Sequence, residues 1–353
     1  MDDTLALLNP WQQRFPLDRR PFATVAAAAC RDEASVIATY RAMNANGKLS
    51  RIGGVFGQGA GGAALLAGMQ VPAERLEAVA AIVSAHPGVN HNYEREHAFN
   101  LWFVMTGRDA EAVDASMAQI ARDTGLPAVA LRMRRAYRID LGFDLRHRTA
   151  KLAPDQAAPA AHRAASAPAL AAVSDGDRAL AALVEEGLPL LPCPYDAWAQ
   201  ALGRTPEAVL ATLAGWLARG TLRRFGAVVR HHELGFGANA MTVFDVPDEC
   251  VDACGEALAQ QAGVTLAYRR ERAPGWRYNL FCMVHGRDRE AVRQVLARVV
   301  PACGLAAWPQ AVLFSRRRFK QTGARRFRDL PTPAVPGAVA ADLPLEDIAH
   351  API

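Results

Sequence analysis

The chain has 353 residues, enough for two domains of ordinary size that each bury a core of their own. Apolar residues make up 51% of it and charged residues 21%, with a net charge of +5, which is typical of a soluble globular protein. No apolar run reaches the roughly 18 residues that a membrane-spanning helix needs, and the N-terminus opens acidic, unlike a secretory signal. The sequence therefore predicts a cytoplasmic protein without a membrane partner.

Six cysteines are spread along the chain without a CxxC pair or a spacing typical of zinc ligands, which predicts packed thiols in a reducing compartment. Only three of the 40 basic residues are lysines, so nearly all of the positive charge is arginine. High-GC coding alone can produce this bias. Arginine nevertheless donates two parallel hydrogen bonds to a carboxylate or phosphate, so the composition permits a polyanionic ligand.

The first part of the chain, residues 1–147, predicts a small helical segment over about 1–56 and a strand–helix–strand–strand–helix–strand unit over about 60–142. This βαββαβ order is that of the ferredoxin-like split sandwich. Residues 148–173 are rich in alanine and proline, which is typical of a flexible linker.

The second part, residues 174–326, predicts the same order, with a helical segment over about 174–230 and a ferredoxin-like unit over about 236–320. Three short helices and a strand pair in each part resemble a winged helix-turn-helix. The elements expected here are helices at 176–187, 195–202, 205–218, 248–261 and 287–302, and strands at 222–230, 238–246, 264–271, 278–285 and 308–314. The tail, 327–353, is proline-rich with little pattern and is predicted to be disordered or draped on the surface.

The two parts are copies of one module. GKLSRIGGVF at 47–56 matches GTLRRFGAVV at 220–229, MQVPAERLEAV at 69–79 matches FDVPDECVDAC at 244–254, and NLWFVMTGRDAEAV at 100–113 matches NLFCMVHGRDREAV at 279–292. Several anchors at equal spacing indicate a duplication. We therefore predict an α+β protein, a tandem repeat of a winged helix-turn-helix plus a ferredoxin-like domain, whose two copies pack as a pseudo-dimer.

The copies diverge in one loop while the flanking segments still align. The second copy has Arg230-His231-His232 after its wing strand, where the first copy has the shorter Gly57-Gln58-Gly59-Ala60-Gly61-Gly62 without an ionisable group. Residues shared by both copies are therefore candidates for structural roles, and unshared residues are candidates for a site. The shared Asp109 and Asp288 stand at predicted helix starts, where aspartate can cap.

A helix-turn-helix followed by a βαββαβ unit resembles the Lrp/AsnC class of transcription regulators across each copy. A recognition helix should present basic or amide side chains to bases and phosphates. The corresponding segments, 32–41 and 205–216, begin with acidic residues or are mostly apolar. We therefore expect no DNA binding.

The polar motifs resemble one family closely, the siroheme decarboxylases, Lrp-like proteins with D-type and L-type subunits that act in haem d1 synthesis. The first copy resembles the D type through HNYEREHxxNxWF and the RPF before its second helix. The second resembles the L type through RRFGAVxxHxxLGFxANAMTVxDVP, YRR and YNLFxMVHGRD. The resemblance covers about residues 10–142 and 172–325 and suggests a fusion of the two subunits. One departure is Leu266, because the L-type pattern often has a histidine two residues before the tyrosine.

The resemblance implies that two acetate carboxylates of siroheme are lost as carbon dioxide to give didecarboxysiroheme, with no cofactor beyond the iron of the substrate. A histidine general acid, its pKa raised by neighbouring carboxylates, suits this chemistry, and arginines suit the many carboxylates of the substrate. The catalytic candidates are His231, His91 and His97. The substrate-binding candidates are Arg95, Arg223, Arg224, Arg270, Arg272, Tyr93, Tyr268 and Asn100.

Several of these assignments have alternatives. His231 is equally consistent with an axial ligand to the siroheme iron. A surface position is an equal alternative for His97, and core packing is one for the matching Tyr93 and Tyr268. Arg224 matches Arg51, so a structural ion pair explains it equally well, whereas Arg223 replaces Ser50, which favours function. Five histidines lack a supporting cluster and are assigned no role: His86, His147, His162, His285 and His350.

We expect one working site, built mainly from the wing and sheet of the second copy, with the HNYER stretch of the first copy contributing. The competing hypotheses are a tetrapyrrole carrier without catalysis and a haem- or siroheme-responsive regulator. Homologous decarboxylase subunits and further copies of this chain are the possible protein partners.

Overall fold

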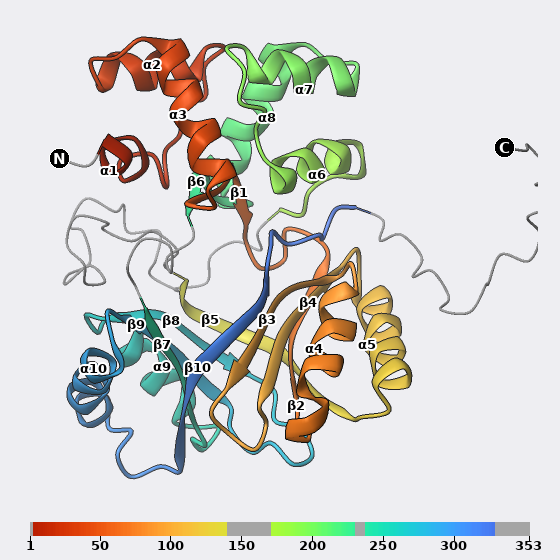
Figure 1. The fold of residues 1–353 in the computed structure, drawn as a ribbon, viewed down its shortest axis with the longest axis vertical. Helices are drawn as coiled ribbons and strands as arrows, with labels where there is room; N and C mark the ends of the chain where they lie inside the picture. The colour runs from red at the N-terminus through yellow and green to blue at the C-terminus, as the bar shows by residue number, and fades with distance from the viewer. Residues whose placement is uncertain (1–2, 140–170, 230–236, 329–353) are drawn as a thin grey trace, which may run out of the picture.

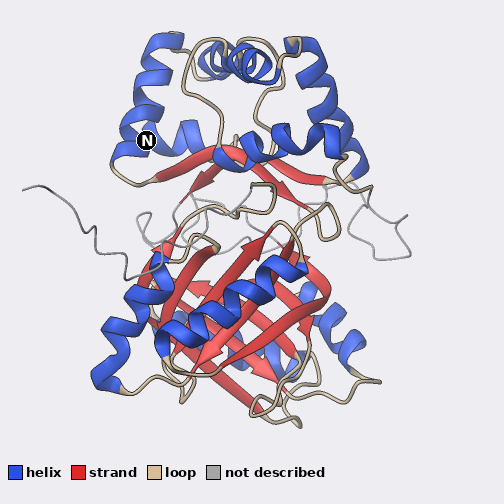
Figure 2. Ribbon diagram, turned by 90° about the vertical axis from the view of Figure 1, so that its right-hand side faces the viewer, coloured by secondary structure: helices blue, strands red, loops and turns tan. Residues whose placement is uncertain are grey.

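The computed structural model describes residues 3–139, 171–229 and 237–328. Within these ranges the chain forms a helical domain and a strand-rich barrel, with the helical domain over one end of the barrel (Figures 1 and 2). Each copy of the repeat contributes to both parts. No helix in these ranges is long and apolar enough to cross a membrane.

Two helices of the helical domain begin at a capping side chain. The Thr205 side chain accepts a hydrogen bond from Ala208 N, and Gly220, in the left-handed conformation, ends the same helix. Asp32 accepts one from Ser35 N at 2.7 Å. The helices of the first copy are α1 (Asp3–Leu8), α2 (Pro21–Ala28) and α3 (Glu33–Ala45), and those of the second are α6 (Arg178–Glu186), α7 (Pro194–Leu202) and α8 (Pro206–Arg219).

One strand from each copy forms the sheet of the helical domain. β1 (Leu49–Phe56) pairs antiparallel with β6 (Leu222–Val229) in a two-stranded sheet. The prediction of a separate strand pair in each copy is therefore wrong, because each wing strand finds its partner in the other copy. A single apolar core joins the two halves, in which the rings of Phe56 and Trp216 lie 5.6 Å apart. The two helical segments thus fold as one domain.

The two ferredoxin-like halves have the predicted βαββαβ order. Asp109 and Asp288 accept hydrogen bonds from Ala112 N at 2.7 Å and Ala291 N at 2.8 Å, which confirms both as helix caps. The first half comprises β2 (Ala63–Met69), α4 (Leu76–Ala85), β3 (Val89–Arg95), β4 (Leu101–Gly107), α5 (Ala110–Thr124) and β5 (Ala128–Ile139). The second comprises β7 (Ala238–Phe244), α9 (Val251–Ala259), β8 (Val264–Arg270), β9 (Leu280–Gly286), α10 (Arg289–Ala302) and β10 (Gln310–Gln321).

The last strand of each half crosses into the other half and closes the barrel. β5 pairs with β2 over 128–132 and then with β8 over 133–139. β10 pairs with β7 over 310–314 and then with β3 over 315–321. The strand order is therefore β10-β3-β4-β2-β5-β8-β9-β7 around a closed barrel. This arrangement is the predicted pseudo-dimer, with the two copies joined by continuous sheet.

The inside of the barrel holds a cluster of apolar and aromatic side chains from both copies. The rings of Trp102 and Trp276 lie 4.8 Å apart, and the Phe99 ring lies 5.3 Å from that of Trp276. An eight-stranded barrel is just wide enough for its own side chains or one small ligand. A ligand as large as a tetrapyrrole therefore has to approach the inward residues from an end of the barrel.

The segment after β10 returns to the helical domain. The Glu185 carboxylate accepts hydrogen bonds from Arg326 N at 2.9 Å and Phe327 N at 3.2 Å. Phe327 is 4% exposed, with its ring 4.6 Å from that of Phe56. The predicted tail therefore begins too early, since Phe327 belongs to the core. The rest of the tail, the linker at 148–170 and the loop at 230–236 lie outside the described residues.

The glycine loop of the first copy makes room for this returning segment. A Cβ added at Gly61, where φ is +139°, would lie 2.7 Å from Phe327, and one at Gly62 would lie 2.5 Å from Arg326 Cβ. Real Cβ atoms essentially never approach that closely. The glycines that set the two copies apart in sequence thus have a packing role.

Candidate functional site

Three polar residues of β3, His91, Tyr93 and Arg95, face the inside of the barrel. The rings of His91 and Tyr93 stack at 6.2 Å, and the Arg95 guanidinium lies 5.7 Å from the Tyr93 ring centroid. Asn92 points the other way and donates to Ala80 O of α4 at 3.2 Å. Alternation along a strand explains this division. We call His91, Tyr93 and Arg95 the β3 polar face.

Arg95 reaches from the first copy into the second. Its Nη1 donates to Leu313 O at 3.0 Å and to Asn239 Oδ1 at 3.3 Å. Asn239 on β7 is paired in register with His285 on β9. Burial and then the charge of Arg95 lower the pKa of His285 to about 4. Arg95, Asn239 and His285 therefore form one group, which we call the Arg95 cluster.

Arg95 is a buried cation. Its residue is 7% exposed, and burial lowers its pKa to about 10, opposed by Tyr268 and Tyr93, so that it stays charged at neutral pH. Its hydrogen bonds run to a carbonyl and an amide oxygen, both neutral. A buried charge is stabilised by an opposite charge, and the described residues place no carboxylate within ion-pair distance of Arg95. This arrangement suits an anionic ligand.

Arg270 occupies the matching place in the second copy. Its Nη1 donates to Leu131 O at 2.8 Å, its guanidinium lies 4.7 Å from the Tyr268 ring, and its Nε is buried without a partner among the described residues. Burial lowers the pKa of Arg270. The ring of Tyr268 stacks on Phe281 at 5.6 Å.

The surroundings of Arg270 differ from those of Arg95. Aligning MQVP with FDVP puts Ala64 and Thr106, which are paired in register, where the other half has Asn239 and His285. Leu266 stands where β3 has His91. The barrel thus has two related arginine sites, and the histidines lie with Arg95.

His91 is neutral in the free protein. Its Nδ1 lies 2.7 Å from Asn90 Oδ1, and burial, followed by the charge of Arg51, lowers its pKa to about 4. We expected neighbouring carboxylates to raise this pKa. That prediction is wrong for His91 in the free protein, because burial has the largest effect on its pKa and the nearby charge that acts on it is that of Arg51.

His97 lies beyond the other end of β3 and is not brought together with His91. Its Nδ1 accepts from Phe99 N at 3.0 Å, and its ring lies 5.5 Å from that of Trp276. Burial lowers its pKa. The side chain is half-buried against the aromatic cluster, which favours a packed position over the surface alternative.

Asn100 holds backbone and does not point at a site. Its Oδ1 accepts from Val71 N at 2.9 Å and its Nδ2 donates to Val71 O at 2.8 Å. Asn279 makes the same two contacts with Val246 in the second copy. This repeated pairing favours a structural role for Asn100 over the predicted role in substrate binding.

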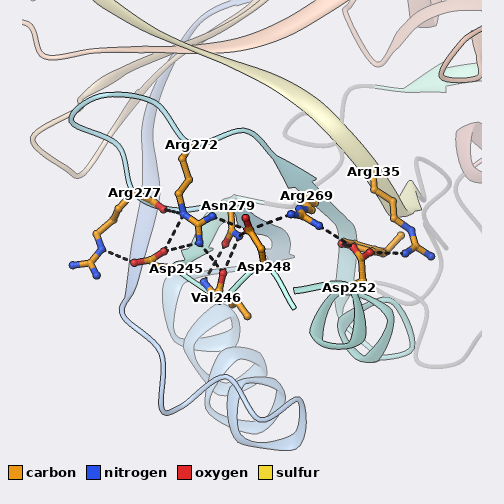
Figure 3. Close-up of polar contacts among 10 residues, drawn as sticks. Arg135, Asp245, Val246, Asp248, Asp252, Arg269, Arg272, Arg277 and Asn279 are labelled. Carbon is orange, nitrogen blue, oxygen red and sulfur yellow. Dashed lines mark hydrogen bonds and ion pairs between the residues drawn. The ribbon is translucent and has the colours of Figure 1, made fainter. Parts of the chain in front are cut away.

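Arg272 is occupied by carboxylates of its own half. It donates to Asp245 at 3.0 Å and to Asp248 at 2.8 Å, and its Nε and Nη2 reach the Arg277 and Val246 carbonyls (Figure 3). The pKa of Asp248 is lowered chiefly by its hydrogen bond from Arg272. The contacts of Arg272 therefore favour a structural role over the predicted substrate clamp.

Arg223 and Arg224 lie on β6 in the helical domain, apart from the barrel residues. Arg223 is exposed, and Arg224 Nη1 donates to Gln12 O at 3.2 Å. His231, with the rest of the loop at 230–236, lies outside the described residues. No group of three or more His, Cys, Asp or Glu side chains in the described part of the chain could hold a metal ion.

His285 is the residue that the sequence reasoning missed. It stands opposite Thr106 in the alignment of the copies, so the comparison of unshared residues that singled out His231 also applies to it. Its Nδ1 lies 2.9 Å from Thr265 Oγ1. The cluster that supports it comes from Arg95, which is distant in sequence.

Two family models match the chain. The AsnC-like ligand binding domain matches residues 60–138 and 233–320, and the siroheme decarboxylase NirDL-like HTH domain matches residues 177–223. The siroheme decarboxylase NirDL subunit of Paracoccus pantotrophus is 41% identical over 327 residues, which cover 92% of this chain and 97% of the relative. The chain belongs to the siroheme decarboxylase family. Members of this family are carboxy-lyases.

Other siroheme decarboxylases match one copy or both. The siroheme decarboxylase NirL subunit of Stutzerimonas stutzeri is 50% identical over 144 residues, 40% of this chain and 85% of that subunit. A crystal structure of the siroheme decarboxylase NirDL in co-complex with an iron-uroporphyrin III analogue superposes with a TM-score of 0.63 at 26% identity, covering 93% of this chain and 94% of that one. The structural similarity to that protein therefore covers both the helical domain and the barrel of this chain.

Proposed function

We propose that this chain decarboxylates siroheme, removing two acetate carboxylates as carbon dioxide to give didecarboxysiroheme. The observation that carries the proposal is the buried, positively charged Arg95 cluster beside His91 in a chain 41% identical to a siroheme decarboxylase over nearly its whole length. The match to a NirDL structure with an iron-uroporphyrin III analogue supports a tetrapyrrole ligand. The substrate brings its own iron, and the proposal includes no further cofactor.

The site lies where the barrel meets the helical domain, and the first copy supplies the β3 polar face. His91 and Thr106 are at this end, since Arg325 N, on the segment returning to the helical domain, donates to Thr106 Oγ1 at 3.1 Å. Asn239 and His285 of the second copy belong to the site as members of the Arg95 cluster. The proposed location gives the first copy a larger share of the site than the sequence analysis expects.

Each decarboxylation consumes one proton. Protonation of the macrocycle makes an electron sink, the bond between the acetate methylene and its carboxylate breaks, and carbon dioxide leaves while the electron pair enters the ring. The methylene then takes a proton to become a methyl group, and the ring gives up the proton that made it a sink. A histidine near the acetate can donate and receive these protons.

Binding of the substrate would favour the protonated form of His91, which can donate a proton. Its pKa of about 4 makes His91 neutral at neutral pH, and a carboxylate of the bound tetrapyrrole placed beside it would raise that pKa. Arg95 would hold a second carboxylate through a charge-assisted hydrogen bond. Tyr93, between them on the same face, would donate a neutral hydrogen bond.

His231 keeps both of its proposed roles, general acid or axial ligand to the siroheme iron. Anaerobic titration of siroheme with the His231→Ala variant separates them, because loss of an axial imidazole changes the absorption spectrum of the bound iron tetrapyrrole, whereas loss of an acid slows turnover and leaves the spectrum unchanged.

Anaerobic incubation of the purified protein with siroheme tests the function. A product that has lost two carbon dioxides supports the enzyme, and tight binding of an unchanged macrocycle supports a carrier instead. A mobility-shift assay with DNA from upstream of its own gene tests the regulator hypothesis.

A further inference from the structure

Two arginines at the boundary between the helical domain and the barrel carry buried, unpartnered donors. Arg51 lies on β1, and Arg326 lies on the segment that returns from β10. The Nε atom of each is buried and has no hydrogen-bond partner among the described residues. Burial lowers the pKa of both side chains. An unpaired buried donor is destabilising, so both positions favour an acceptor from outside the described residues, and an anionic ligand would supply one.

The Arg51 side chain is surrounded by three glycines, Gly53, Gly187 and Gly323. A Cβ added at Gly187 would lie 2.8 Å from Arg51 Cβ, one at Gly323 would lie 3.0 Å from its Nη1, and one at Gly53 would lie 3.2 Å from its Nε. Three chain segments therefore leave just enough room for this side chain. The guanidinium is placed by its surroundings before any ligand binds.

The charges at this boundary do not balance. Glu185 is the acid whose charge raises the pKa of both arginines, against the larger effect of burial. Its Oε2 already accepts from Arg326 N and Phe327 N. Burial also raises the pKa of Glu185, which disfavours its charged form. Among the described residues, these two partly buried cations thus share one acid, Glu185, and a further anion would stabilise them.

The same boundary adjoins the β3 polar face. Gln321 is paired with His91 across β10 and β3, and Thr322 N donates to Asn90 O at 2.7 Å. A Cβ added at Gly323, the next residue, would lie 3.0 Å from Arg51 Nη1. Arg51 is therefore the cation next to His91, consistent with the effect of its charge on that histidine.

We propose that Arg51 and Arg326 together bind one side-chain carboxylate of the tetrapyrrole and so orient the macrocycle against the β3 polar face. This inference rests on the proposed function for the identity of the ligand. It differs from the expectation that Arg224, the counterpart of Arg51 in the second copy, binds substrate. Arg224 lies on β6 and donates from Nη1 to Gln12 O at 3.2 Å.

Anaerobic titration of siroheme, followed by its absorbance, tests the pair in wild type, Arg51→Gln and Arg326→Gln. We expect each variant to bind siroheme roughly ten- to a hundred-fold more weakly, the usual loss for a charge-assisted hydrogen bond. Fully esterified siroheme, which has no carboxylate, should bind wild type and both variants equally. Arg41→Gln is the control, because Arg41 is an exposed helical-domain arginine that donates to Leu190 O. It should bind siroheme as wild type does.

Glu185→Gln gives a change in the opposite direction. Glutamine keeps an acceptor for the two backbone N–H groups and removes the competing negative charge. At pH 8 we expect this variant to bind siroheme several-fold more tightly, whereas a purely structural role predicts equal or weaker binding. Wild-type affinity in the folded Arg51→Gln and Arg326→Gln variants would overturn the inference. If Arg51→Gln fails to fold, equal or weaker binding of siroheme by Glu185→Gln would overturn it. A wild-type protein that binds siroheme without decarboxylating it refutes the proposed function alone, and the losses in the arginine variants would still support the pair.

Discussion

Arg95 and Asn239 are 144 residues apart, and a hydrogen bond of 3.3 Å from Arg95 Nη1 to Asn239 Oδ1 joins the two copies of the repeat. At the matching place in the other half, Arg270 has Ala64 in the position of Asn239 and Thr106 in that of His285. The duplication therefore built two related arginine sites and equipped one of them with histidines. This asymmetry leads to predictions in which one half of the barrel is the control for the other.

Arg95→Gln and Arg270→Gln form a matched pair. Both arginines are buried and donate to a carbonyl of the strand that crosses from the other half, so we expect similar losses of stability on urea unfolding. Activity should differ, with kcat/KM for siroheme falling roughly 100-fold in Arg95→Gln and by less than ten-fold in Arg270→Gln. Equal losses of activity would show that the two halves contribute alike.

His91→Gln should lower kcat far more than it lowers stability. Removal of a general acid typically costs about 10²–10⁴-fold in rate, and glutamine retains a polar side chain for the contact with Asn90. Single-turnover rates with siroheme measure this effect. His86→Gln is the control, since His86 is a buried histidine whose Nδ1 accepts from Gly88 N outside the β3 polar face. A normal rate in His91→Gln would remove His91 from the mechanism.

Stability should fall as the pH is lowered through the range in which His91 and His285 titrate. Both have a pKa of about 4 in the folded protein, below the ordinary value of 6.5, so the unfolded chain binds more protons between these values. The free energy of unfolding therefore decreases from pH 6.5 to pH 4, by at most about 1.4 kcal/mol per pH unit for each histidine. Urea unfolding of wild type and of a His91→Gln, His285→Gln double variant checks this. The variant should have a flatter pH dependence, and an unchanged slope would contradict the assignment.

Gly61→Ala and Gly59→Ala separate crowding from backbone strain in the glycine loop. Both glycines have positive φ, but a Cβ at Gly61 would lie 2.7 Å from Phe327, whereas one at Gly59 meets nothing within 4 Å. We expect Gly59→Ala to cost about 1–2 kcal/mol and Gly61→Ala about 1–3 kcal/mol more. Chemical denaturation measures both. Equal losses of stability in the two variants would mean that the Phe327 side chain moves aside without much destabilisation.

Much of the fold could be predicted from the sequence, because both copies carry the same caps and the same alternation of strands. The expected helix starts at Thr205, Asp109 and Asp288 are confirmed by their hydrogen bonds. The pairing of β1 with β6 could not be predicted in this way, since a strand pattern does not identify the partner strand. For the same reason the second half of β10 could not be predicted. Its run of arginines is not typical of a strand, and its ion-pair partners, Glu94 and Glu96, lie on β3.

The candidate site could be predicted only where the residues lie on one strand. Alternation places His91, Tyr93 and Arg95 on a single face, and the motif that contains them stood out in the sequence. Asn239 and His285 become candidates only when Arg95 is seen to reach them across β10. Asn100 stood out in the same motif, but its side chain binds the backbone of Val71 in the same way as its counterpart Asn279 binds that of Val246.

Anaerobic turnover of siroheme in deuterated water, followed by mass spectrometry of the tetrapyrrole, tests the central claim most directly. The account predicts a product that has lost two carbon dioxides and gained two new methyl groups, each with a deuterium from solvent. The same reaction with Arg95→Gln should be strongly slowed. Siroheme recovered with its mass unchanged from a protein that binds it would contradict the account.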